Sequence, residues 1–325
     1  MAHAGEVIPF NEEFVYLDPE LLKKLKAQID FMEGAGYLDL MKAVYTGQLD
    51  DGLEVSVPED LLERTRELSR VDAMPIPAGL QAVLRPYQER GYSWLMRNLT
   101  LGLGALIADD MGLGKTLQVI TTLLAMKERG EFDSEKVIAV VPATLMTNWM
   151  REIKRFAPSL TANIYHGSGR RLDPVEERAD VTITTYGTLK RDAAILAGET
   201  WRLMVVDEAQ AVKNTTSLVT QTVRGFPARQ VLAMSGTPVE NRLMEYWSLL
   251  SIVQPGVLGS RDEFLKSFAQ PIESDRSEHA LEAFRRVTAP FMLRRLKTDK
   301  SIIADLPEKV VCDRYVDLTP EQAAL

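Results

Sequence analysis

The chain has 325 residues, of which 46% are hydrophobic and 26% charged, values typical of a globular protein with one large domain and a smaller unit. Its single cysteine, Cys312, excludes an internal disulfide, and with only three histidines a zinc site is not expected. No stretch has the length and apolarity of a membrane span, and the N-terminus lacks a secretory pattern. We therefore expect no membrane partner and a cytoplasmic protein, associated with the nucleoid in a bacterium or located in the nucleus of a eukaryote.

The net charge of −8 is unevenly distributed along the chain. Residues 1–83 carry 7 Lys and Arg against 16 Asp and Glu, whereas residues 84–325 carry 31 basic and 30 acidic residues. The overall charge argues against a nucleic-acid partner, but the near-neutral remainder leaves room for one wherever basic residues gather on the fold. The candidate clusters are Arg170-Arg171, Lys190-Arg191 and Arg294-Arg295-Lys297, although such clusters are usually solvated surface.

Residues 1–83 are predicted to form a mostly helical accessory region. Helical patterns run over Pro19–Glu33, Leu38–Tyr45 and Pro58–Arg70, and prolines at 75 and 77 mark the boundary that follows. The role of this region is unknown, and a contact with protein partners is one interpretation.

From Leu84 onward, short β-rich runs alternate with helical patterns, which predicts an α/β fold with a mainly parallel sheet flanked by helices. Several of the runs end in polar or small residues. In such sheets the ligand lies beyond the carboxyl ends of the strands, so we expect these residues to gather at one edge. The predicted strands are Ala105–Ala108, Val137–Val141, Asn163–Tyr165, Val181–Thr184, Leu203–Val206 and Gln230–Ala233.

A glycine-rich turn lies between the first of these strands and a predicted helix over Thr116–Arg129. Its sequence is Asp110-Met111-Gly112-Leu113-Gly114-Lys115-Thr116. Backbone N–H groups in such a turn, at the start of a helix, hold polyphosphate, so the turn predicts an ATP-binding loop. Lys115 would reach the β- and γ-phosphates and the Thr116 hydroxyl would bind Mg²⁺. A strict loop of this type has glycine at position 109, where this chain has aspartate; a chance glycine-rich turn is the alternative.

A second candidate site follows the strand that ends at Val206. Asp207 is suited to hold the Mg²⁺ that bridges the phosphates, and Glu208 to polarise the attacking water. An acidic pair at a strand end is common on protein surfaces, but an ATPase needs both this pair and the loop. Together they predict catalytic roles for Lys115, Asp207 and Glu208.

Seven motifs occur in a fixed order along the chain. They are Leu84-Arg85-Pro86-Tyr87-Gln88 with Gly91 and Trp94-Leu95; the loop at 110–116; Val141-Pro142-Ala143-Thr144-Leu145 with Asn148-Trp149; Thr184-Thr185-Tyr186; Asp207-Glu208-Ala209-Gln210; Ser235-Gly236-Thr237-Pro238 with Glu240-Asn241; and Phe291-Met292-Leu293-Arg294-Arg295 with Lys297-Thr298-Asp299 and Leu306-Pro307. This set resembles the SWI/SNF family of DNA-dependent ATPases, within helicase superfamily two. The family commonly has aspartate at the position of Asp109, and its usual next residue is glutamate rather than Asp110.

The resemblance implies roles for individual residues. Gln88 would read the adenine, while a second group would contact DNA and a third would couple ATP to DNA. The DNA-contact candidates are Thr144, Asn148, Thr184 and Thr185, and the coupling candidates are Gln210, Ser235, Gly236 and Thr237. Gln210 stands where the family most often has histidine, which puts the coupling between lobes in doubt.

Several of these residues also have an ordinary structural interpretation. Trp149 could simply pack its helix, and Tyr186 is better read as a packing residue than as a base stacker. The adjacent Arg294 and Arg295 would normally form a solvated face.

The resemblance implies a P-loop RecA-like lobe over residues 84–310, with residues 311–325 starting a linker to a second lobe that this sequence does not contain. The intact protein would be an ATP-driven translocase on double-stranded DNA that does not separate strands. Since arginines from the second lobe complete such sites, we expect this truncated chain alone to bind ATP weakly and hydrolyse it poorly. The alternatives are an RNA helicase of the same superfamily and a non-catalytic nucleotide sensor that docks a partner.

Overall fold

The computed structural model describes residues 7–10, 13–16, 72–236 and 243–299. In the accessory region, β1 (Val7–Phe10) and β2 (Glu13–Tyr16) form an antiparallel hairpin in which Val7 lies opposite Tyr16. Residues 7–10 and 13–16 of a region predicted to be mostly helical are thus β-strands. The three helices predicted between residues 19 and 70, the linker at 311–325 and Thr237 lie outside the described residues.

Seven parallel strands form the central sheet of the described chain, in the order β5-β6-β4-β7-β8-β3-β9. The runs of Val, Ile and Ala in the inner strands are almost entirely buried on both faces, as expected for a parallel sheet covered by helices, whereas the edge strands β5 and β9 are only partly buried. The bounds are β3 (Ala105–Ile107), β4 (Lys136–Val141), β5 (Ala162–Ile164), β6 (Val181–Thr185), β7 (Trp201–Val206), β8 (Val231–Met234) and β9 (Met292–Leu293). All six predicted strands are confirmed within two residues, and β9 is a two-residue addition.

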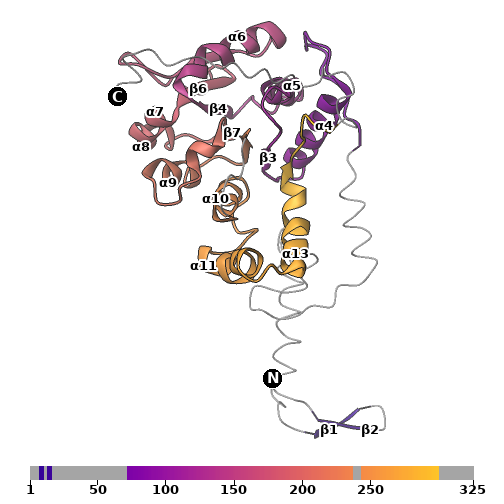
Figure 1. The fold of residues 1–325 in the computed structure, drawn as a ribbon. Helices are drawn as coiled ribbons and strands as arrows, with labels where there is room; N and C mark the ends of the chain where they lie inside the picture. The colour runs from indigo at the N-terminus through magenta and orange to yellow at the C-terminus, as the bar shows by residue number, and fades with distance from the viewer. Residues whose placement is uncertain (1–6, 11–12, 17–71, 237–242, 300–325) are drawn as a thin grey trace, which may run out of the picture.

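Helices cover both faces of the sheet, which confirms the predicted α/β class (Figure 1). The α-helices are α4 (Pro86–Thr100), α5 (Lys115–Glu128), α6 (Met146–Phe156), α7 (Tyr186–Arg191), α8 (Ala193–Leu196), α9 (Leu218–Arg224), α10 (Leu243–Val253), α11 (Arg261–Phe264), α12 (Gln270–Glu273) and α13 (Glu278–Thr288). Short 3₁₀ turns occur at η1 (Ala143–Leu145), η2 (Ala209–Val212) and η4 (Ala289–Phe291), and η3 (Leu265–Ala269) is a π-helix. No helix in these described ranges has the length and apolarity to span a bilayer.

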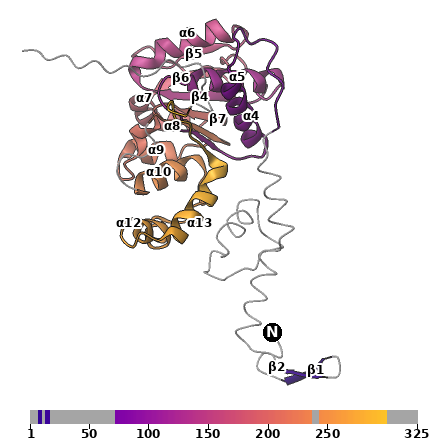
Figure 2. The same cartoon turned by 45° about the vertical axis from the view of Figure 1, so that its right-hand side comes forward.

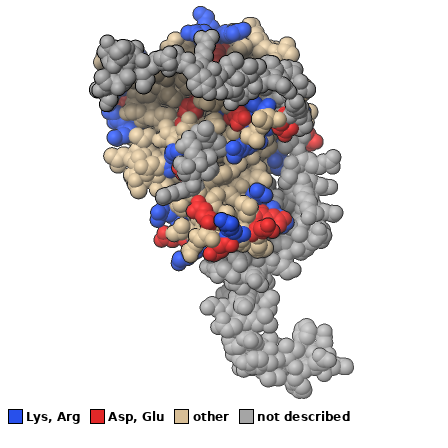
Figure 3. Space-filling view, in the orientation of Figure 1, with Lys and Arg blue, Asp and Glu red and all other residues tan. Residues whose placement is uncertain are grey.

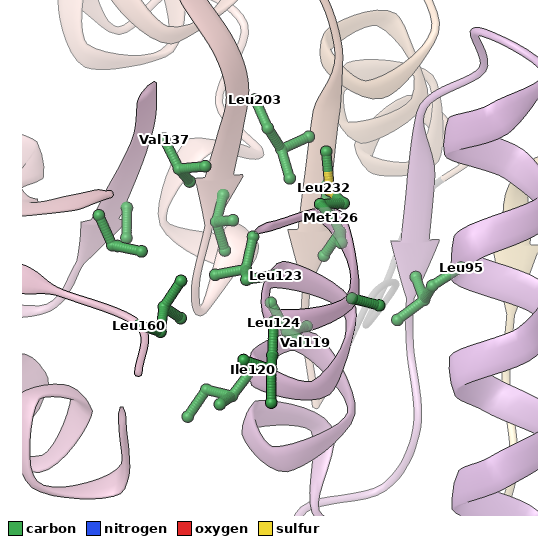
Figure 4. Packing of buried hydrophobic residues seen from close by; sticks show 14 of the residues in the cluster. Leu95, Val119, Ile120, Leu123, Leu124, Met126, Val137, Leu160, Leu203 and Leu232 are labelled. Atoms are coloured by element: carbon green, nitrogen blue, oxygen red, sulfur yellow. The ribbon is translucent and has the colours of Figure 1, made fainter. Parts of the chain in front are cut away.

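Three hydrophobic clusters hold these layers together. On one face, α4, α5 and α6 pack on the sheet, with Val119, Ile120 and Leu123 of α5 at the centre (Figure 4). Helices α7 to α10 cover the other face, as Figure 2 also shows. A third cluster around Phe264 and Phe284 joins α10, α11 and α13 beyond the sheet. The apolar positions of α5 therefore fix the start of this helix, and with it the glycine-rich turn, against the sheet.

Residues 72–83 run along the first helical layer without regular structure. The backbone N–H of Met74 donates to Ser93 Oγ at 3.0 Å, and that of Gly79 donates to Glu128 Oε1 at 2.8 Å. The Gln81 N–H donates to the Phe156 carbonyl at 2.7 Å. This segment thus bonds to α4, α5 and α6, while the domain boundary between residues 83 and 84 stays a prediction.

Candidate nucleotide-binding site

Three adjacent strands bring polar residues to one edge of the sheet. Asp109 follows β3, Asp207 follows β7 and Ser235 follows β8, and these strands are neighbours in the order β7-β8-β3. Because the strands are parallel, their carboxyl ends meet at the same edge, as predicted. The glycine-rich turn (residues 110–116), the acidic turn (Asp207 and Glu208) and the start of the coupling motif (Ser235 and Gly236) therefore lie close together.

The glycine-rich turn has a backbone that only glycine adopts easily. Gly112 and Gly114 have φ angles of 82° and 72°, in the left-handed region. A Cβ on Gly114 would also lie 2.4 Å from Nε2 of Gln88, so the Gln88 amide would have to move to admit a side chain there. Gly114 directly precedes α5, so the turn presents the N-terminus of a 14-residue helix. This is the geometry that binds phosphate groups.

A cavity of about 470 Å³ opens in front of this turn. Its walls come from the turn and the start of α5, from η1 and α6, and from the acidic turn after β7. The lining residues are Met111, Gly112, Gly114, Lys115, Thr116, Leu117, Leu145, Asn148, Trp149, Glu152, Phe156, Asp207 and Glu208. The cavity thus gathers all three predicted catalytic residues and both predicted magnesium ligands.

Lys115 brings a positive charge to this cavity. Its Nζ donates to the carbonyl oxygens of Asp109 and Asp110, at 2.7 and 3.3 Å. Burial lowers the pKa of the Lys115 ammonium, and the carboxylates of Asp109 and Glu208 oppose this shift. A partly desolvated ammonium beside helix N–H groups is suited to bind the terminal phosphates of a nucleotide.

The Asp207 carboxylate is held by a hydrogen bond on each oxygen. The indole N–H of Trp149 donates to Oδ2 at 2.8 Å, and the backbone N–H of Glu208 donates to Oδ1 at 2.8 Å. Burial raises the pKa of Asp207, and the Trp149 hydrogen bond partly opposes the rise. The group is 5% exposed and faces the cavity.

The donor set fits magnesium. Thr116 and Asp207 offer a hydroxyl and a carboxylate oxygen to the same cavity, and Mg²⁺ prefers oxygen ligands. In the described ranges, no group of three or more His, Cys, Asp or Glu could hold a metal. One or two protein oxygens, completed by water and phosphate, are how Mg²⁺ is usually bound with a nucleotide.

The acidic turn has an unusual backbone at Glu208, whose φ of 51° is left-handed for a residue with a side chain. Such strain costs about 1–3 kcal/mol and is concentrated at functional sites. The Tyr186 hydroxyl donates to the carbonyl of Asp207, and Gln210 Nε2 donates to Glu208 Oε2 at 2.5 Å. Ser235 Oγ in turn donates to Gln210 Oε1 at 2.8 Å. Gln210 therefore links Glu208 to the end of β8, even though the family usually has histidine there.

A buried ion pair between Arg295 and Asp109, which was not predicted from the sequence, lies directly before the glycine-rich turn in the fold. The guanidinium of Arg295 pairs with both carboxylate oxygens of Asp109 and also donates to Gln118 Oε1 at 2.7 Å and to the Tyr87 carbonyl. Asp109 is fully buried and Arg295 is 6% exposed. The expectation of a solvated arginine is therefore wrong at 295, while Arg294 is exposed. An aspartate at the end of an apolar strand was the signal, because such a buried charge needs a partner.

The predicted adenine reader, Gln88, touches the loop without lining the cavity. Its Nε2 donates to the Leu113 carbonyl at 3.3 Å, and its Oε1 accepts from the Arg85 N–H at 2.9 Å. The Tyr87 hydroxyl also donates to the Leu113 carbonyl, at 3.2 Å. The start of α4 thus supports the loop. Asp110 likewise lies outside the cavity lining and accepts a hydrogen bond from the Lys297 N–H at 2.9 Å.

The four DNA-contact candidates differ in accessibility. Thr144 is exposed and Asn148 lines the cavity. Thr184 is buried and its hydroxyl donates to the Tyr165 carbonyl at 2.9 Å. Thr185 is also buried and caps α7 by accepting from the Thr188 N–H. The burial of these two hydroxyls argues against a phosphate contact through either of them, and all four assignments stay predictions.

The remaining coupling candidates lie beside the loop. A Cβ on Gly236 would meet Cγ of Met111 at 2.7 Å, so glycine lets the chain after β8 pass close to the loop. Met111 is 62% exposed, and Leu113 is buried against Tyr87.

Comparison with known proteins agrees with this geometry. Residues 87–325 match the SNF2-related domain family. The chain is 34% identical over 348 aligned residues to the Bacillus subtilis protein named "Putative ATP-dependent helicase/translocase YwqA", covering all of this chain and 38% of that protein. It is also 34% identical to the TATA-binding protein-associated factor mot1 of Schizosaccharomyces pombe, covering 81% of this chain and 15% of that protein.

Solved structures show the same fold. The SWI2/SNF2 ATPase core of Sulfolobus solfataricus in complex with double-stranded DNA has a TM-score of 0.66 and 40% sequence identity, covering 78% of this chain and 53% of that chain. The SWI2/SNF2 ATPase core domain from the same organism has a TM-score of 0.65 and 38% sequence identity. The predicted RecA-like class is thereby confirmed. The chain spans only about half or less of each of these proteins.

Proposed function

Because the chain belongs to the SNF2-related domain family of helicase-like ATPases, we propose that it is the ATP-binding first lobe of a translocase on double-stranded DNA. The observation that carries the proposal is the single cavity that gathers Lys115, Thr116, Asp207 and Glu208 at the N-terminus of α5. These are the groups that ATP hydrolysis requires, drawn from two separate turns of the chain.

Each group has a distinct task in this proposal. The N–H groups of the turn and the Lys115 ammonium hold the β- and γ-phosphates. Thr116 and Asp207 hold the magnesium ion, which when bound neutralises charge on the transferring phosphoryl group. Glu208 lies next to Asp207, where its carboxylate orients the attacking water and accepts its proton. ATP and water then give ADP and inorganic phosphate.

The proposed motor needs a second lobe to complete the site. P-loop NTPases gain about 10³–10⁵-fold in the rate of hydrolysis from an arginine that another domain or subunit places against the phosphates. Among the described residues that line the cavity, Lys115 is the only Lys or Arg. We therefore propose that this chain alone binds ATP weakly and hydrolyses it slowly.

The DNA partner is supported by the surface beside the cavity. Helix α6 buries Trp149 and Ile153 and exposes basic residues on its other side, namely Arg151, Lys154 and Arg155. Figure 3 shows Lys and Arg side chains gathered at the top of the molecule, where Figure 1 places α6. Thr144 lies in η1, directly before α6, and Asn148 lies in the first turn of α6, so polar and basic groups along this segment are suited to contact a phosphate backbone. The solved structure of the Sulfolobus core contains double-stranded DNA.

The test measures steady-state ATP hydrolysis by a protein that contains this chain and a second lobe. We expect duplex DNA to stimulate turnover more than structured RNA does, without separation of the strands, and we expect Lys115→Ala to abolish the stimulated rate. Stimulation by RNA alone would favour the RNA helicase alternative. Partner binding that survives Lys115→Ala, with no turnover in the unmodified protein, would favour the non-catalytic module.

A further inference from the structure

Trp149 is placed differently from an ordinary core tryptophan. It lies on the first turns of α6, is 1% exposed, and packs in the cluster between α6, α5 and the sheet. Its indole N–H does not meet a backbone carbonyl but donates to Oδ2 of Asp207 at 2.8 Å. These two residues are 58 positions apart in the sequence, so the contact exists only in the folded protein.

This contact controls the direction of the Asp207 carboxylate. The Glu208 N–H fixes Oδ1 at 2.8 Å and the indole N–H fixes Oδ2 at 2.8 Å. Because these two N–H donors come from different parts of the fold, they fix the rotation of the carboxylate about its Cβ–Cγ bond. Each oxygen accepts hydrogen bonds through two lone pairs, so each keeps one for a magnesium ion or its water. The carboxylate is therefore oriented by the fold itself.

We propose that Trp149 is a positioning residue that holds the Asp207 carboxylate ready for the magnesium of bound nucleotide. The inference rests on the proposed function, since it assigns a task toward the Mg²⁺ that the ATP site would contain. Partners that orient a ligating side chain in this way are worth about 10- to 100-fold in metal affinity or activity.

The competing explanation is that Trp149 only fills the core. The chain contains a matched control in Trp201, which is fully buried and donates its indole N–H to the Leu196 carbonyl at 2.8 Å. Trp201 is the first residue of β7, its side chain packs in the cluster on the opposite face of the sheet, and it does not line the cavity. Replacing either tryptophan with phenylalanine removes one indole ring and one hydrogen bond from a buried site, but only Trp149→Phe removes a donor to Asp207.

The experiment measures the equilibrium affinity of this chain and its variants for ADP, once with Mg²⁺ and once with EDTA. In the unmodified chain, Mg²⁺ should strengthen ADP binding. In Trp149→Phe, we expect the gain from Mg²⁺ to fall by about 10-fold or more, with the affinity in EDTA unchanged. Trp201→Phe should retain the full gain. A purely structural role for Trp149 would weaken binding equally in both conditions.

Failure of the proposed function and failure of the positioning role give different results. If the unmodified chain does not bind ADP, or binds it without regard to Mg²⁺, the proposed function is wrong. If it shows the Mg²⁺ gain and Trp149→Phe retains that gain, the positioning role is wrong.

A measurement on the unmodified chain covers the case in which Trp149→Phe does not fold. With ¹⁵N-labelled tryptophan, the indole N–H resonance of Trp149, assigned by substituting the other tryptophans, should shift when Mg²⁺ is added to the ADP complex. The resonance of Trp201 should not shift. If the chemical shift of the Trp149 indole N–H did not change on addition of Mg²⁺, the proposal would be wrong.

Discussion

Replacing Arg295 with methionine should destabilise the protein far more than replacing an exposed arginine. Methionine keeps most of the apolar stem but leaves the carboxylate of Asp109, which is fully buried, without its charged partner. Removing one member of a buried ion pair costs about 3–5 kcal/mol. The guanidinium also donates to Gln118 and to the Tyr87 carbonyl, and its Cζ lies 5.2 Å from the centre of the Tyr87 ring, so these contacts are lost as well.

The matched control is Arg171→Met. The Arg171 side chain is 81% exposed and pairs with Asp173 at 2.9 Å, so its loss should cost no more than about 1 kcal/mol. At about 2–4 °C per kcal/mol for a domain of this size, Arg295→Met should lower the melting temperature by about 6–20 °C. Urea denaturation measures the change in the free energy of unfolding, and calorimetry measures the change in melting temperature.

A double-variant cycle identifies the cause of that loss. Asp109→Ala combined with Arg295→Met should cost clearly less than the sum of the two single changes, since no unpaired charge is left buried. A buried ion pair would be excluded as the cause if Arg295→Met cost as little stability as Arg171→Met, or if the free-energy costs of the changes at 109 and 295 were additive.

Four further predictions concern the cavity and its support. Lys115→Ala should remove measurable ATP binding while leaving the melting temperature within a few degrees, as titration calorimetry and thermal unfolding would show. Glu208→Gln should keep nucleotide affinity but abolish turnover in the two-lobed protein, because the amide cannot accept the proton of the attacking water; equal loss of binding would contradict this role. Gln210→Ala should leave ATP affinity intact and slow DNA-stimulated turnover, since it cuts the link from Glu208 to Ser235; an unchanged rate would exclude coupling through this side chain. Tyr186→Phe should cost about 1 kcal/mol in urea denaturation, because its hydroxyl donates to the Asp207 carbonyl at the strained turn; a neutral effect would show that Glu208 keeps its backbone without that bond.

Much of the sheet and the loop could be predicted from the sequence. The strand runs are dense in Val, Ile and Leu and bounded by polar residues, and a pattern of this kind depends on local residues alone. The predicted helix at 116–129 appears as α5 at Lys115–Glu128 for the same reason. Parallel pairing then places the residues that follow β3, β7 and β8 at one edge of the sheet. The proximity of Lys115, Asp207 and Glu208 therefore follows from the strand assignments alone.

The residues that support the site could not be predicted in this way. Arg295 and Asp109 are 186 positions apart, and Trp149 and Asp207 are 58 apart. In each case the residue has an ordinary local interpretation, as a surface charge or as a packing aromatic. Only the fold shows that its polar atom meets a buried carboxylate. Thr184 shows a related limit, because a motif resemblance carries no information about exposure and this residue is buried.

The central claim is that the cavity in front of α5 binds ATP with magnesium through the glycine-rich turn. The most direct measurement is a calorimetric titration of this chain with a non-hydrolysable ATP analogue in Mg²⁺, repeated on Lys115→Ala. We expect one nucleotide per unmodified chain and no measurable binding to the folded variant. Equal binding by both proteins, or none by the unmodified chain at millimolar nucleotide, would contradict it.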